Sequence, residues 1–310
     1  KDLCNFSKVI NIDNQIYFKD YIKFIDSLNY NEVKIDFRKD LNFKEYFNEI
    51  DAIIVLGGLV GDPITKLYPT ESISINEDAI LNILTKSLEY KVPKIIFAST
   101  CSNYGKLAFN LVADENTPLS PLSLYAKSKV KIENFLIQNF SPSTCITILR
   151  FATAFGLSPR MRYDLTVNQF VREAYYKKYV EVYDGDTFRP YCHVKDFSRI
   201  IQNIIINQDI DRFKNQIFNV GRDDNNCSKK DLINKITKQI PNFEYKLVEN
   251  TLDQRNYVVN FNKIKKDLLF EPEFSIENGI TEILEILKMG LHPFSGTEKY
   301  GNYELIKFKL

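Results

Sequence analysis

Short apolar runs rich in β-branched residues recur along the chain at a regular rhythm. Six of them predict strands, namely "KVINID" (8–13), "EVKID" (32–36), "DAIIVLG" (51–57), "PKIIFAS" (93–99), "TCITILR" (144–150) and "NQIFNVG" (215–221). Several are apolar at nearly every position, which is typical of strands buried on both faces of a parallel sheet. Helical patterns separate them, over 17–28, 75–90, 124–139 and 195–207. The alternation predicts an α/β fold with a doubly wound parallel sheet.

After residue 156 the rhythm loosens. Helical patterns near 164–178, 228–240 and 276–288, with a strand at 179–184, predict a smaller α+β lobe near the C-terminus. We therefore expect the sheet domain to span 1–156, with 192–227 returning to it. The lobe is then made by 157–191 and 228–310.

The start of the chain departs from the pattern of a dinucleotide-binding sheet. Such a sheet begins with a strand, a glycine-rich turn and a helix, because the glycines let the backbone approach the pyrophosphate. Here "KDLCNF" resembles the end of that helix, and Gly57, Gly58 and Gly61 follow a later strand. We expect the first strand and its loop to lie upstream of Lys1. The alternative is that the protein never had this loop.

Composition narrows the choice of partners. The 41 Lys and Arg residues nearly balance the 40 Asp and Glu residues, so no nucleic-acid or membrane partner is expected. No apolar run reaches membrane-spanning length, and the first residues show no signal peptide. The five cysteines are widely spaced without a CxxC pair, and there are two histidines. This favours free thiols in the cytoplasm and no metal site.

The stretch "SLYAKSK" places Tyr125 and Lys129 four residues apart, on one face of a predicted helix. A free phenol has a pKa of about 10, and a neighbouring ammonium favours the phenolate. The pair can then accept a proton from an alcohol that is being oxidised. Upstream, "IIFASTCSNYG" brings Thr100 and Ser102 to the carboxyl edge of the sheet, where open α/β folds bind ligands.

Five segments in order carry a resemblance to a known family: "STCSNYG", "ADENTPLSPLSLYAKSKVKIE", "LRFATAFG", "FRPYCHVKD" and "FNVG". Together they resemble the extended short-chain dehydrogenase/reductase family, from about residue 8 to residue 290. Within it, the chain is most similar to NAD-dependent nucleotide-sugar epimerases and dehydratases of the UDP-glucose 4-epimerase kind. The resemblance implies a Rossmann-like NAD-binding domain and a substrate lobe for the nucleotide sugar.

The resemblance also implies roles for individual residues. Tyr125 would be the catalytic base, Lys129 its partner on the nicotinamide ribose, and Thr100 the catalytic hydroxyl. An acid at Asp13 would repel a 2′-phosphate, which favours NAD over NADP. The implied cofactor contacts are Asp13, Asp36, Phe37, Leu56, Gly57, Gly58, Tyr125, Lys129 and Phe151. The implied substrate contacts are Ser102, Thr153, Asn168, Arg189 and Arg255, the two arginines gripping the diphosphate.

One departure bears on the reaction. Relatives that dehydrate the sugar carry Asp-Glu directly after the catalytic Thr, where this chain has Cys101 and Ser102. That argues against a 4,6-dehydratase. The stretch "RFATAFGLSPRMRYDLTVNQF" resembles a subgroup associated with polysaccharide biosynthesis.

We therefore expect an NAD-dependent oxidoreductase or epimerase that oxidises a ring hydroxyl, at C4, of a nucleoside-diphosphate sugar. From the resemblance we also expect a cytoplasmic homodimer. Two alternatives stay open: a non-catalytic protein that binds NAD or a sugar nucleotide on the same fold, and an inactive, N-terminally truncated copy.

Overall fold

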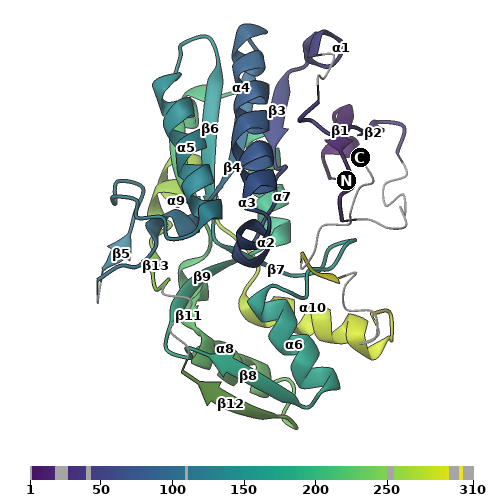
Figure 1. Ribbon diagram of the computed structural model, residues 1–310, viewed down its shortest axis with the longest axis vertical. Helices are drawn as coiled ribbons and strands as arrows, with labels where there is room; N and C mark the ends of the chain where they lie inside the picture. The colour runs from purple at the N-terminus through teal and green to yellow at the C-terminus, as the bar shows by residue number, and fades with distance from the viewer. Residues whose placement is uncertain are drawn as a thin grey trace.

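The computed structural model describes residues 2–17, 27–39, 43–108, 111–249, 255–292 and 300–302. A parallel sheet with helices on its faces forms the upper part of the molecule in Figure 1, and a smaller helical lobe lies below it. Most of the helix predicted over 17–28 lies outside the described residues.

The central sheet has four parallel strands, and each coincides with a predicted apolar run. Their order is β10 (Gln216–Val220), β6 (Cys145–Phe151), β4 (Lys94–Thr100) and β3 (Ala52–Val55). Every residue of β6 is buried, because this strand has neighbours on both edges and helices on both faces. The fold is therefore the doubly wound α/β class that the pattern predicts.

The other two predicted strands pair with each other. These are β1 (Val9–Asp13) and β2 (Tyr30–Lys34), and among the described residues neither is hydrogen-bonded to β3. Ile12 of β1 and Ile53 of β3 instead pack against one cluster around Phe47 and Val92. The pattern predicts one continuous sheet. The structure has two parallel units, β1–β2 and β10–β6–β4–β3, which contact each other through side chains.

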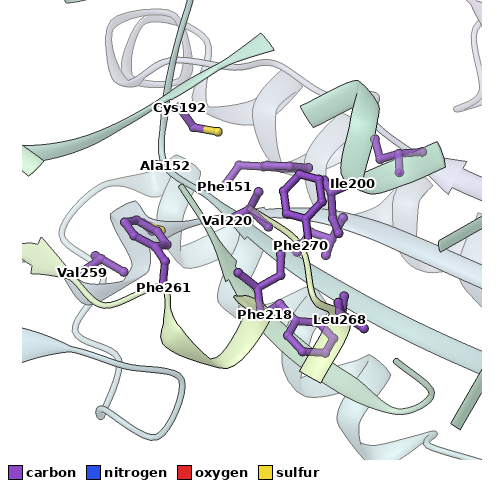
Figure 2. Packing of buried hydrophobic residues seen from close by; sticks show 14 of the residues in the cluster. Phe151, Ala152, Cys192, Ile200, Phe218, Val220, Val259, Phe261, Leu268 and Phe270 are labelled. Atoms are coloured by element: carbon purple, nitrogen blue, oxygen red, sulfur yellow. The ribbon is translucent and has the colours of Figure 1, made fainter. Parts of the chain in front are cut away.

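Successive side chains along a strand point to opposite faces of the sheet, and each face is covered by different helices. Ile95 and Phe97 of β4 point to α4 (Ile80–Glu89) and α5 (Leu124–Gln138). Ile96, between them, points to α7 (Val194–Ile206) on the other face. Figure 2 shows the cluster on that second face, to which Phe151 of β6, Phe218 of β10 and Ile200 of α7 belong.

The lobe has a core of its own, built on three helices and a parallel strand pair. The helices are α6 (Thr166–Tyr176), α8 (Lys229–Thr237) and α10 (Ile276–Lys288), and the strands are β8 (Tyr179–Tyr183) and β12 (Glu244–Val248). A small sheet of β7 (Thr153–Phe155), β9 (Phe188–His193) and β11 (Asn226–Ser228) runs between sheet domain and lobe (Figure 1). Because this sheet belongs to both parts, the expected domain boundaries stay predictions.

The remaining elements are short. They are the helices α1 (Phe43–Phe47), α2 (Asp62–Leu67), α3 (Pro69–Ile73) and α9 (Asn262–Leu268), the π-helical turn η2 (Ser74–Ala79), the 3₁₀ turns η1 (Asp2–Asn5), η3 (Cys101–Tyr104), η4 (Ile210–Arg212) and η5 (Asp223–Asn225), and the strands β5 (Val112–Ala113) and β13 (Val258–Val259). The turn η1 agrees with the helical character of "KDLCNF". In the described part of the chain, no helix is both long enough and apolar enough to span a bilayer, and no acidic, His or Cys cluster is arranged to hold a metal ion.

A buried histidine fastens the lobe to the small sheet. His193, at the end of β9, contacts the carboxylate of Glu282 on α10 through Nε2, and its Nδ1 accepts a hydrogen bond from the backbone N–H of Lys195. Gly156 lies so close that an added Cβ would stand 2.3 Å from the ring. With both ring nitrogens occupied by the fold, His193 has a structural role.

Candidate active site

Helix α5 carries Tyr125 in its first turn. Ser123 caps the helix, its hydroxyl accepting a hydrogen bond of 3.2 Å from the backbone N–H of Ala126. One turn later, the ammonium of Lys129 lies 5.8 Å from the centre of the Tyr125 ring. The two side chains therefore share a helix face, as their spacing predicts.

The charge balance around Tyr125 differs from the expectation. The Lys129 ammonium donates a hydrogen bond of 2.7 Å to the carbonyl of Ala98 on β4, and burial lowers its pKa to about 8. Burial raises the pKa of Tyr125, the carboxylate of Asp62 raises it further, and Arg162 opposes them. In this structure burial thus outweighs any lowering by Lys129. A base at Tyr125 needs further positive charge at the site.

Thr100 and Ser102 lie at the carboxyl end of β4, as predicted. The hydroxyl of Thr100 accepts a hydrogen bond of 3.1 Å from the backbone N–H of Ser102 and so caps η3. The hydroxyl of Ser102 lies 3.3 Å from that of Tyr257. Helix α5 packs against both β4 and η3, so Thr100 and Tyr125 stand on neighbouring elements.

A buried ion pair lies beneath these residues. Arg150 of β6 donates to both carboxylate oxygens of Glu133, one turn along α5 from Lys129. Ser99 and Asn103 donate to the same carboxylate, and the Arg150 guanidinium also donates to the hydroxyl of Tyr104. Helix α5 is thereby fixed to the ends of β4 and β6, which carry the expected catalytic and cofactor residues.

Several expected cofactor contacts gather at the ends of β1 and β3. Asp13 ends β1, and one carboxylate oxygen accepts a hydrogen bond of 2.6 Å from the backbone N–H of Gln15. An added Cβ on Gly57 would lie 3.0 Å from the ring of Phe37, so these two residues are in contact. Gly58 has a φ of 147° and lies against the amide of Asn76. Only glycine is comfortable in this conformation.

The three other predicted cofactor residues, Asp36, Leu56 and Phe151, differ in how accessible they are to a ligand. The Asp36 carboxylate forms an ion pair with Arg38, which lowers its pKa, so it is already occupied. The ring of Phe151 lies 4.0 Å from the Phe197 ring, centre to centre, inside the core shown in Figure 2. Leu56 is 57% exposed directly after β3. The exposed Leu56 could contact a cofactor directly. Phe151 is buried and would instead support the residues that contact the cofactor.

The residues present fit an NAD cofactor. The acid at the end of β1 suits two ribose hydroxyls, and the glycines after β3 leave the backbone of that loop open to close approach. Asp13, Phe37, Gly57 and Lys129 would hold the group between β1, β3 and α5. When bound, NAD supplies an acceptor for hydride.

The two predicted diphosphate arginines are brought together. Arg189 of β9 donates to the backbone carbonyl of Arg255 and to that of Phe188, and its guanidinium lies 5.3 Å from the Tyr257 ring centre. Arg255 in turn forms an ion pair of 2.7 Å with Asp62. Thr153 begins β7 and pairs with Tyr191 in the small sheet.

The predicted substrate residue Asn168 is hydrogen-bonded within the fold. Its side chain is buried on α6, accepts a hydrogen bond of 3.1 Å from the backbone N–H of Gly156 and donates one of 3.0 Å to the carbonyl of Arg162. Both ends of the amide therefore hold the loop that precedes α6. A substrate contact by Asn168 would have to break one of these bonds.

Sequence reasoning missed two charged residues of this site. Asp62 opens α2 and pairs with Arg255, and Arg162 binds the Asp164 carboxylate with bonds of 2.7 and 2.6 Å. Both influence the pKa of Tyr125. The signals were present as "GDP" after the β3 glycines and as an Arg-x-Asp spacing in "SPRMRYD". Neither pattern by itself predicts a functional residue. Their relation to the site becomes visible only in the fold.

Comparison with known proteins shows the family of this chain. A family model described as the NAD dependent epimerase/dehydratase family matches residues 7–221. The chain is 26% identical to the UDP-glucuronate 4-epimerase of Thermodesulfobacterium geofontis, over 82% of this chain and 78% of that protein. It is 25% identical to a putative UDP-glucose 4-epimerase of Methanocaldococcus jannaschii, over 83% of each chain.

Among solved structures, the UDP-glucose 4-epimerase of Thermotoga maritima in complex with UDP-glucose is similar in fold, with a TM-score of 0.80 and 22% identity over 94% of each chain. The family model covers more than half of the chain. The chain therefore belongs to the NAD-dependent epimerase/dehydratase family, whose cofactor is NAD.

Proposed function

We propose that this protein epimerises a nucleoside-diphosphate sugar at C4 by transient oxidation of the ring hydroxyl, with Tyr125 as the base. The observation that carries the proposal is the arrangement around α5. Tyr125 and Lys129 share one face of this helix, and Thr100 ends the neighbouring strand. The arginines 189 and 255 meet nearby, with Asp62 linking Arg255 to the Tyr125 side of the site.

The reaction consists of the loss of a proton and a hydride from the C4 carbinol, followed by the return of both. Tyr125 takes the proton of the C4 hydroxyl while Thr100 holds the oxygen, and the C4–H bond breaks with its electron pair leaving as hydride, so that a ketone forms. Return of the hydride to the opposite face of C4, with return of the proton from Tyr125, gives the epimer. Lys129 keeps positive charge close to the phenolate during both transfers.

The choice of C4 epimerisation over two other reactions has separate support. The two curated relatives named above are 4-epimerases. Dehydration needs an acid and a base after Thr100, but burial raises the pKa of the Cys101 thiol and its Sγ donates to the carbonyl of Arg150. Net dehydrogenation would release a keto sugar and use up one NAD for each turnover. A homodimer in the cytoplasm stays a prediction from the resemblance.

Replacing Arg255 with Ala tests the diphosphate grip. We expect KM for the nucleotide sugar to rise more than tenfold while kcat falls less than threefold, because a phosphate contact acts on substrate and transition state alike. A charge-assisted contact of about 1.5–3 kcal/mol corresponds to this change. Initial rates over a range of sugar-nucleotide concentrations measure both constants.

The matched control is Arg222→Ala. Arg222 also pairs with a carboxylate, that of Asp224, but this pair lies on the surface beside η5. Its KM should equal that of the parent. An Arg255→Ala protein with the parent's KM, or one in which only kcat falls, argues that the diphosphate binds elsewhere.

A further inference from the structure

The C-terminal segment Tyr300–Asn302, here called the strap, crosses from the lobe to the loop after β3. Asn302 is 6% exposed and uses its whole amide. Its Nδ2 donates a bond of 3.1 Å to the carbonyl of Val60, and its Oδ1 accepts one of 2.9 Å from Arg160. Its backbone N–H donates a bond of 3.3 Å to the Asp164 carboxylate. One residue thus joins the loop after β3 to the loop before α6.

The strap has an anchor that does not depend on Asn302. The backbone carbonyl of Tyr300 accepts a hydrogen bond from the N–H of Tyr163. The guanidinium of Arg172, on α6, lies 4.4 Å from the Tyr163 ring centre and 5.5 Å from that of Tyr300. Arg160 also donates to the carbonyl of Gly301, at 2.9 Å. The strap therefore binds the lobe through Tyr300 and Gly301, independently of the bond from Asn302 to Val60.

The loop held by Asn302 carries Arg162. Asp164 binds the Arg162 guanidinium with two bonds, and an added Cβ on Gly61 would lie 3.9 Å from Nη2 of Arg162. The tie from Asn302 to Val60 acts on the residue directly before Gly61. Gly61 immediately precedes α2, and α2 packs against α5, the helix that carries Tyr125, so the loop that carries Arg162 lies beside the candidate site.

We propose that Asn302 is a positioning residue for the catalytic centre, and that the strap fastens the loop before α6 over the loop after β3 so that Arg162 faces Tyr125. The inference rests on the proposed role of Tyr125. It adds a function for the chain's C-terminal segment that neither the α5 pair nor the arginines at 189 and 255 require.

The electrostatics of Tyr125 agree with this geometry. Within the described part of the chain, the charges that act on the phenol are those of Asp62 on α2, Arg162 in the loop before α6 and Tyr257 before β13, and the Lys129 ammonium lies 5.8 Å from the ring centre. Asp62 and Tyr257 raise the pKa of Tyr125, and Arg162 lowers it. Charge interactions fall off with distance, so loosening the Arg162 loop would stabilise the phenolate less and raise the pKa of Tyr125.

The test is Asn302→Ala in the full-length natural protein with NAD bound. We expect the acidic limb of the kcat–pH profile to move upward by about 0.5–1 pH unit. The titration of the Tyr125 ring carbon, followed by NMR and assigned with Tyr125→Phe, should move in the same direction. Arg162→Gln should give at least as large a shift. Adding Asn302→Ala to it should change little, because both act through one group.

Asn225→Ala is the control for a purely structural loss. Asn225 is 1% exposed and, like Asn302, uses both ends of its side-chain amide, here with the backbone carbonyl of Phe274 and the backbone N–H of Ile276. Asn225 ends η5 and its amide binds the start of α10, so this variant should lose stability and keep the parent's titration. If Asn302→Ala also lowers only the thermal midpoint and moves neither titration, the inference is wrong.

The proposed function fails by a different result. If Tyr125→Phe turns over as fast as the parent, Tyr125 is not the base. The NMR titration of its ring needs no turnover, so it still decides whether the strap positions Arg162.

Discussion

Replacing Tyr125 with Phe is expected to lower kcat by about a thousandfold, the range that general-base catalysis contributes. Phe keeps the ring against the rest of α5 and removes only the oxygen that accepts the C4 hydroxyl proton. The neighbouring residues Thr100 and Ser102 are neutral hydroxyls and the Lys129 ammonium donates to the carbonyl of Ala98, so none of these three is a base that could take its place. Turnover by the full-length natural protein at saturating substrate measures the effect.

The control is Tyr90→Phe. Tyr90 follows α4 at the opposite end of the sheet, shortly before β4 begins, and its ring is partly exposed. Its loss of a hydroxyl should leave kcat unchanged. A Tyr125→Phe protein that keeps NAD and more than a tenth of the parent's kcat would remove Tyr125 from the mechanism.

The second large effect is on stability. Glu133→Ala is expected to lower the free energy of unfolding by about 3–5 kcal/mol, because it leaves the Arg150 guanidinium buried and unpaired. The two side chains are 0% and 4% exposed, and the carboxylate also accepts hydrogen bonds from Ser99 and Asn103. Urea unfolding followed by circular dichroism measures the loss. Glu133→Gln, which keeps the shape and part of the hydrogen bonding, should lose less.

Glu89→Ala provides the contrast for Glu133. Glu89 pairs with Lys86 on the exposed side of α4, where solvent screens the charges, so its removal should leave the urea midpoint nearly unchanged. A Glu133→Ala protein that unfolds at the parent's urea midpoint would show that the pair contributes nothing net. Helix α5 would then have to be positioned by its apolar contacts alone.

The long elements were predictable because each has a period. The continuous apolar runs became β4 and β6, and the helical spacing became α5 and α7, within a residue or two of their ends. Strands such as β5 and β13 have two residues each and show no period. They form because backbone groups far apart in the chain pair with each other. A local sequence pattern does not predict such pairing.

The candidate site shows the same division. Tyr125, Lys129 and Thr100 lie within short motifs. The spacing of Tyr125 and Lys129 places them on one helix face, and Thr100 is placed by the end of its strand. Side-chain hydrogen bonds that depend on how loops pack were not predictable: Asn168 binds the backbone of the loop before α6, and Asn302 binds Val60 across 242 positions. Asp36 was assigned without its neighbour Arg38, although the two are only two residues apart.

The most direct measurement follows deuterium placed at C4. The full-length natural protein is incubated with UDP-, dTDP-, GDP- and CDP-hexoses, each deuterated at C4, and the products are analysed by NMR. The account predicts that at least one sugar is converted to its C4 epimer with the deuterium retained, and that Tyr125→Phe abolishes the conversion. Failure to convert any of these sugars, or a product whose C4 deuterium has exchanged with solvent, would contradict it.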